Sequence, residues 1–123
     1  MKEKLPQEIE VWDILPAIRK AFAKVFVEHF KLSQKKTAEL LQITEPAVSQ
    51  YLKDKRAKNI LFNDNILDEI KKSANRILDK KSYLFKEIKR ICDLLDVKKI
   101  VCRIHRESND KIPCDCDICL TNN

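Results

Sequence analysis

The stretch that decides the architecture of this chain is SQKKTAELLQITEPAVSQYL, residues 33–52. Ser33 and Thr44 are good helix N-caps, and the residues after each have helical apolar spacing, which predicts helices over 34–41 and 45–53. Ala38 is small enough to let these two helices cross closely. The apolar residues placed to hold the pair together are Leu41, Ile43, Val48 and Tyr51. The stretch therefore predicts two short helices joined by a tight turn of about three residues.

Apolar periodicity on either side predicts three more helices, over 16–30, 65–79 and 83–95. Pro16 suits a first helical turn, while Asp64 and Ser82 are candidate N-caps. Residues 7–15 begin with alternating apolar and acidic side chains, which predicts a short strand or an arm over the first helix. The predicted fold class is all-α: a five-helix domain with this short N-terminal strand or arm and a small irregular cysteine-rich tail.

The composition excludes several classes of function. The 123 residues include no glycine, where average usage would give about nine. Phosphate-binding loops, dinucleotide fingerprints and nucleophile elbows all need glycine and are therefore excluded, and no other catalytic set stands out, so we expect no enzymatic activity. No segment has the apolar length of a membrane span, and the first residues lack the apolar core of a signal peptide. We therefore expect a cytoplasmic protein without membrane contact.

The charge distribution favours a polyanionic partner. The net charge is +6, and residues 31–58 hold seven Lys or Arg against three acids, a net +4. A short capped helix can enter the major groove of DNA, and a basic run directly after it can contact phosphates. Gln50 can pair with adenine and Glu45 with cytosine. The expected DNA-binding residues in and after the second helix are its cap Thr44, then Glu45, Pro46, Ala47, Ser49 and Gln50, and then Lys53, Lys55 and Arg56.

Residues 32–34, 38–41 and 47–52 resemble the repressor/Cro-like (XRE-type) helix-turn-helix family of transcriptional regulators, and within it predicted archaeal regulators that carry cysteines in their second half. The resemblance covers roughly residues 8–58, and more loosely the tail. It implies that Gln34 hydrogen-bonds a DNA phosphate and that Glu45, Ser49 and Gln50 face the bases. The family usually has glycine after the first of the two helices, whereas this chain has Gln42. A left-handed glutamine there would cost about 1 kcal/mol.

Four thiols lie close together in the C-terminal tail, at Cys102, Cys114, Cys116 and Cys119. The Cys116-x-x-Cys119 spacing lets two sulfur atoms reach one metal centre, and an all-thiolate set of four suits an iron–sulfur cluster, either 4Fe-4S or 3Fe-4S. An alternative set replaces Cys114 by His105 and suits tetrahedral zinc. A third possibility is that the thiols are unligated or form a disulfide.

These features divide the chain into three predicted parts: an N-terminal arm and DNA-binding domain over 1–62, a pair of helices over 63–96 and a cysteine-rich tail over 97–123. A stripe suited to another helix predicts homodimerisation through the middle part, at Leu84, Ile88, Ile91 and Leu95. The expected function is sequence-specific transcriptional regulation on a two-fold DNA operator, with sensing of iron, sulfur or redox status. The alternatives are a regulator with a structural zinc site and a non-enzymatic interaction module such as an antitoxin.

Overall fold

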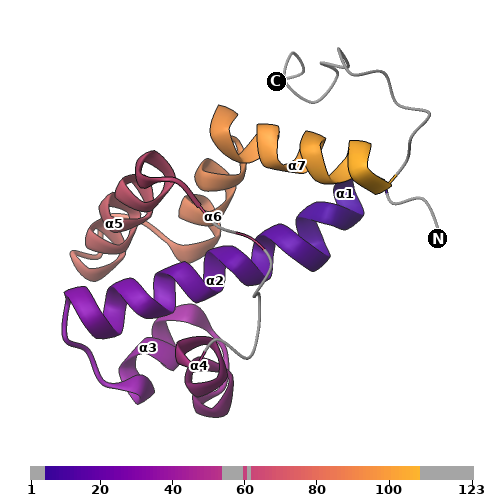
Figure 1. The fold of residues 1–123 in the computed structure, drawn as a ribbon. Helices are drawn as coiled ribbons and strands as arrows, with labels where there is room; N and C mark the ends of the chain where they lie inside the picture. The colour runs from indigo at the N-terminus through magenta and orange to yellow at the C-terminus, as the bar shows by residue number, and fades with distance from the viewer. Residues whose placement is uncertain (1–4, 54–59, 61, 109–123) are drawn as a thin grey trace.

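The computed structural model describes residues 5–53, 60 and 62–108, and all regular structure in these ranges is helical, which confirms the all-α class (Figure 1). The elements are α1 (Pro6–Ile9), the π-helical segment η1 (Glu10–Ile14), α2 (Leu15–Lys24), the π-helical segment η2 (Val25–His29), α3 (Gln34–Leu41), α4 (Glu45–Leu52), α5 (Asp64–Leu78), α6 (Leu84–Cys92) and α7 (Leu95–Ser108). None of these helices is long and apolar enough to cross a membrane.

The first four elements form one continuous helix, because α1, η1, α2 and η2 follow one another without a break over residues 6–29. The expected strand or arm at residues 7–15 is therefore wrong. Ile9 and Ile14 are both fully buried, whereas Val11 is exposed. A π-helix places residues five apart on one face, so the spacing of the two isoleucines fits this geometry and the apparent alternation was misleading.

Pro16 lies inside this long helix and does not begin it, contrary to expectation. Proline has no N–H to donate, and its ring crowds the carbonyl four residues earlier. The helix accommodates it directly after the wider π-helical turn, in which the Leu15 N–H donates to the Glu10 carbonyl.

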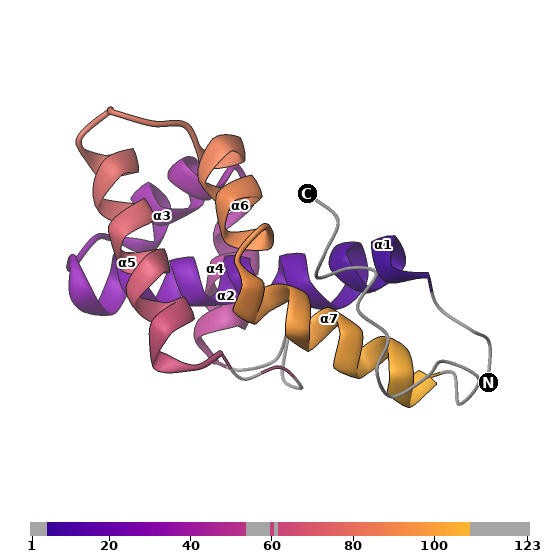
Figure 2. The same cartoon turned by 90° about the horizontal axis from the view of Figure 1, so that it is seen from above.

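The long helix crosses the molecule, and the other helices pack around it (Figures 1 and 2). α3 and α4 contact each other and α2 on one side, α5 contacts α2 and η2, and α7 contacts α1 and η1. Phe22 and Phe26 lie fully buried in the centre, with ring centroids 5.9 Å apart. The side chains buried around them include Ile18, Leu41, Val48, Ile66, Ile70, Ile91 and Val97. The core therefore joins the α3–α4 pair to the rest of the domain.

A buried carboxylate joins α5 to α6. Glu87 is only 3% exposed. It accepts hydrogen bonds from the Ser82 hydroxyl at 2.6 Å, Arg76 at 3.1 Å and Arg90 at 3.2 Å. Burial by itself would raise the pKa of Glu87, but these hydrogen bonds, with a further one from Ser73, lower it to about 2. The ionised carboxylate is therefore a structural part of the fold.

Residues 97–108 are helical, although an irregular tail was expected from residue 97. The helix predicted over 83–95 is present as α6, but it ends at Cys92, and Leu95 already begins α7. In α7 the buried residues Val97, Ile100 and Val101 follow helical spacing. This short apolar stripe was obscured in the sequence by the cysteines and charges around it.

Two predicted N-caps are displaced by one residue. Asn63 caps α5, because its Oδ1 accepts a hydrogen bond from the Ile66 N–H at 2.9 Å, and Asp64 is the first residue of the helix. Tyr83 precedes α6, and Ser82 instead donates to Glu87.

Three helices end without glycine at residues with left-handed backbones: Lys31 (φ 61°), Gln42 (φ 58°) and Lys80 (φ 60°). Glycine usually occupies such positions because a Cβ atom clashes there with the following carbonyl oxygen. Each of these positions therefore carries a conformational cost that a glycine would not.

Candidate nucleic-acid interface

Helix α3 begins with the cap that the sequence predicts. The Ser33 Oγ accepts a hydrogen bond from the Lys36 N–H at 3.1 Å, and the buried Thr37 donates its hydroxyl to the Ser33 carbonyl oxygen at 2.9 Å. Gln34, Lys35 and Lys36 are exposed on the first turn. An amide and two ammonium groups thus lie beside the N–H groups at a helix N-terminus, an arrangement that suits a phosphate group.

The turn after α3 contains the left-handed glutamine expected from the absence of glycine. Gln42 has φ 58° and ψ 40°. The Ile43 N–H donates to the Ala38 carbonyl at 3.1 Å and the Gln42 N–H to the Glu39 carbonyl at 3.3 Å, which is the Schellman pattern of helix termination. Thr44 then caps α4, accepting from the Ala47 N–H at 3.2 Å. These bonds fix the geometry between α3 and α4.

Helix α4 has one buried and one accessible face. Glu45 and Pro46 are exposed, and Ser49 and Gln50 are half-exposed. Ala47 was expected to face outward, but it is only 6% exposed. It lies on the inner face with the buried residues Val48 and Tyr51, because these three positions share the side of the helix that packs on α2 and α3.

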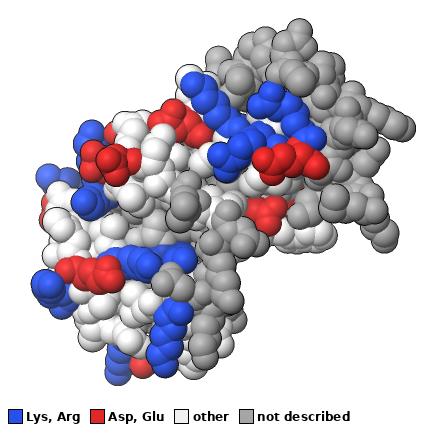
Figure 3. Space-filling view, in the orientation of Figure 1, with Lys and Arg blue, Asp and Glu red and all other residues white. Residues whose placement is uncertain are grey.

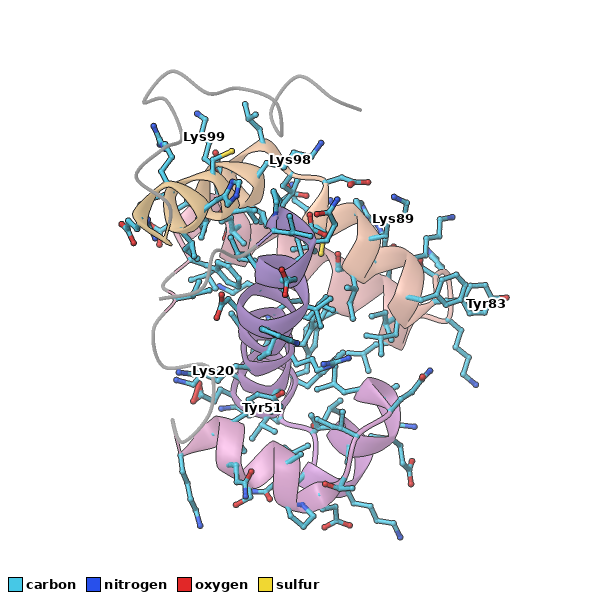
Figure 4. All side chains as sticks on the ribbon, turned by 90° about the vertical axis from the view of Figure 1, so that its right-hand side faces the viewer. Lys20, Tyr51, Tyr83, Lys89, Lys98 and Lys99 are labelled. Carbon is cyan, nitrogen blue, oxygen red and sulfur yellow. The ribbon has the colours of Figure 1, made fainter. Side chains whose placement is uncertain are left out.

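The packing between the long helix and α4 includes a polar group. Figure 4 shows Lys20 of α2 and Tyr51 of α4 where these two helices pack. Tyr51 is 4% exposed, so its ring belongs to the core, as the sequence predicted. The packing of α4 on α2 leaves Glu45, Ser49 and Gln50 on the accessible side of α4.

Positive charge lies at both ends of the α3–α4 pair. Lys31 precedes α3 and Lys53 follows α4, and both are exposed. Lys55 and Arg56, also expected to contact phosphates, lie outside the described residues. Figure 3 shows lysine and arginine side chains at the outer edge of this part of the surface.

Two interface candidates were missed in the sequence. Lys35 and Lys36 are exposed on the first turn of α3, next to Gln34. The available signal was a pair of lysines directly after a helix cap, where their ammonium groups flank the helix N-terminus.

Only part of the predicted cysteine site lies in the described residues. Cys102 is in α7 and 6% exposed, and His105 is half-buried one turn later. Cys114, Cys116 and Cys119 lie outside the described residues. Within the described part of the chain no three metal-ligating side chains come together. The candidate cluster set therefore has one described member and the zinc set has two.

The expected dimer stripe is partly internal. Ile91 is fully buried within the monomer, while Leu84 and Ile88 are half-buried and Leu95 is 53% exposed. The larger exposed apolar surface lies beside this stripe, at Tyr83 (70%) and Phe85 (74%), whose rings stack with centroids 5.7 Å apart. Tyr83 is labelled in Figure 4, where it projects from the molecule. A groove of about 330 Å³ adjoins Phe85 and is lined by the apolar residues Leu15, Leu41, Leu84 and Ile88 and the polar residues Arg19, Gln42 and Lys89.

Comparisons with models of protein families, with curated proteins and with solved structures gave no match to this chain. Its function is therefore inferred from its own residues and their geometry.

Proposed function

We propose that the protein is a sequence-specific DNA-binding transcriptional regulator that inserts α4 into the major groove of double-stranded DNA. The observation that carries this proposal is the α3–α4 pair: two capped eight-residue helices, joined by residues 42–44, with accessible polar side chains on the first turns of both. A single helix fits a major groove about 12 Å wide. The sequence resemblance to the XRE-type family supports the same assignment.

In this proposal the bases are read from the accessible face of α4. Gln50 forms paired hydrogen bonds with an adenine, Glu45 accepts one from a cytosine amino group, and Ser49 contacts either base type. Pro46 offers an apolar contact to a thymine methyl group. The buried position of Ala47 removes it from this set.

The phosphates on either side of the groove are contacted from the helix ends. Gln34, Lys35 and Lys36 contact one backbone from the start of α3, and Lys53 contacts the other, together with Lys55 and Arg56. Such contacts supply affinity without sequence preference and make binding depend on salt.

We further propose that the regulator acts as a homodimer in the cytoplasm on a two-fold operator. Tyr83, Phe85 and the adjoining groove support this part of the proposal, because a protruding aromatic residue and an apolar groove on one surface can be exchanged between two copies. This surface keeps Leu84 and Ile88 of the stripe first expected, but not Ile91, which is internal.

The C-terminal cysteines are proposed to hold an iron–sulfur cluster through Cys102, Cys114, Cys116 and Cys119. A bound cluster would make the regulator responsive to iron, sulfur or redox status. Cys102 lies in α7, which packs on α1, η1 and α6, so ligation there would favour one packing of α7 over another. A ligand that binds two protein states unequally shifts their populations and thereby changes DNA affinity.

A zinc site is the second candidate for the cysteine region, and one observation favours it. Cys102 and His105 are three residues apart on α7, so their side chains lie on neighbouring turns of one helix face. With Cys116 and Cys119 they would complete a tetrahedral Cys₃His set.

The experiment that tests the DNA-binding proposal is selection from a random duplex library by the full-length protein, followed by sequencing. Enrichment of two related half-sites with centres about one helical turn apart supports the proposal. The control is the Ser49→Ala, Gln50→Ala double variant, which should lose or alter the enriched sequence while keeping its fold. A library with no enriched sequence at any salt concentration contradicts the proposal and leaves an interaction module as the better assignment.

A further inference from the structure

A second strongly charged surface lies on α7, away from the α3–α4 pair. A groove of about 420 Å³ is lined by Asn63, Asp96, Lys99, Ile100, Arg103 and Arg106. The three basic residues are spaced at i, i+4 and i+7, which places them on one face of the helix. Figure 3 shows a concentration of Lys and Arg side chains over this end of the molecule.

The one acidic residue that lines the groove, Asp96, is hydrogen-bonded to two asparagine side chains. Asp96 Oδ2 accepts hydrogen bonds from the side-chain amides of Asn65 at 2.9 Å and Asn63 at 3.3 Å. These bonds connect the start of α7 to the start of α5 and lower the pKa of Asp96. The groove therefore has a fixed wall, and three cationic side chains line it against one carboxylate.

Two of the cationic side chains, those of Lys99 and Arg103, are accessible to a ligand. Lys99 and Arg103 are exposed, and within the described part of the chain Arg103 has no hydrogen bond or salt bridge. An arginine fork and an ammonium group separated by one helical turn can contact several oxygens of one anion, or of two linked anions. Ile100, which is 9% exposed, forms an apolar floor that offers no competing polar group.

We propose that this groove binds phosphate groups. In Figure 1 α7 and the α3–α4 pair lie at opposite ends of the molecule, with the long helix between them, so the groove is separate from the proposed DNA-reading surface. The phosphates belong either to the backbone of a nucleic acid or to a free phosphorylated small molecule. The two sources share one recognition chemistry and are separated by experiment.

The test uses the full-length protein with Lys99→Ala, Arg103→Ala as the variant and Lys71→Ala, Lys81→Ala as the control. The control removes the same charge from exposed lysines on other parts of the surface. Binding of inorganic pyrophosphate is followed by backbone amide chemical shifts at constant ionic strength. We expect shifts at Asn63 and residues 99–106, and at least about tenfold weaker binding in the variant than in the control, because charge-assisted hydrogen bonds are lost.

The second arm measures binding to a short duplex DNA as a function of salt. If the groove contacts a nucleic acid backbone, the variant should lower the salt slope by up to about two units relative to the control. An unchanged slope together with weakened pyrophosphate binding assigns the groove to a free phosphorylated molecule. If the variant matches the control in both arms, the proposal is wrong.

Two single substitutions at Arg103 separate the loss of charge from a loss of folding. Arg103→Lys keeps the charge and should retain most of the pyrophosphate binding, whereas Arg103→Ala alone tests the site if the double variant is destabilised. The inference is independent of the DNA-reading proposal. If the protein still selects an operator but the α7 variants behave like the control, only the phosphate-groove proposal is wrong.

Discussion

Replacing Gln42 by glycine should stabilise the protein. Gln42 has φ 58° and ψ 40° at the end of α3. A left-handed backbone costs a non-glycine residue about 1–2 kcal/mol, and glycine recovers this cost while losing about 0.5–1 kcal/mol through the greater freedom of the unfolded chain. The expected net gain is therefore about 0.5–1 kcal/mol, which corresponds to roughly 2–5 °C in Tm for a chain of this size.

The assay is urea unfolding followed by circular dichroism, with the midpoint compared at constant m-value. Gln42→Ala is the first control, since alanine keeps the Cβ atom and should be no more stable than the natural protein. Glu39→Gly is the second, because glycine inside α3 should destabilise by about 1 kcal/mol. Adding Lys31→Gly and Lys80→Gly should raise the total gain to about 1.5–3 kcal/mol, since distant sites add. A Gln42→Gly variant no more stable than Gln42→Ala would refute the reasoning.

Three other predictions follow from the structure. Folding lowers the pKa of Glu87 to about 2, so its contribution to the free energy of unfolding, on the order of 3 kcal/mol, should be complete above about pH 5 and lost as the pH falls toward 2. In the Glu87→Gln variant this part of the pH dependence should disappear from urea unfolding curves. An unchanged pH profile in that variant would contradict the prediction. Phe85→Ser should weaken self-association by about 2 kcal/mol, the effect of losing a hot-spot aromatic residue, as measured by light scattering, whereas a dimer of unchanged strength would exclude this surface. After anaerobic reconstitution, Cys116→Ser should lose bound metal while Cys92→Ser keeps it; loss on His105→Ala with retention in Cys114→Ser would select zinc over a cluster.

The parts of the fold that could be predicted are those fixed by local chemistry. The bounds of α3 match the sequence prediction and those of α4 differ by one residue, because Ser33 and Thr44 each satisfy backbone N–H groups within their own first turn. The left-handed backbone at Gln42 was also predictable, since the turn after α3 needs a left-handed residue at this position and the residue there is not glycine. Local caps therefore define the α3–α4 pair before any tertiary contact is known.

The parts that could not be predicted depend on distant contacts. Residues 7–15 are helical because α7 covers α1 and η1, and nothing in their own pattern indicates that partner. The inward position of Ala47 has the same origin, since a small residue fits either face of α4 and only packing on α2 and α3 decides. The buried carboxylate of Glu87 pairs with Arg76 eleven residues earlier in the chain, a partnership that charge patterning alone does not single out.

The measurement that tests the central proposal most directly is the ratio of affinities for an enriched duplex and a scrambled duplex of the same length. The account predicts a ratio of at least about 10³ for the natural protein. It also predicts a loss of about 1–3 kcal/mol in Gln50→Ala at a single base position, with Lys71→Ala unchanged on both duplexes. Equal affinity of the natural protein for the two duplexes, or an equal loss on both in Gln50→Ala, would contradict base reading by α4.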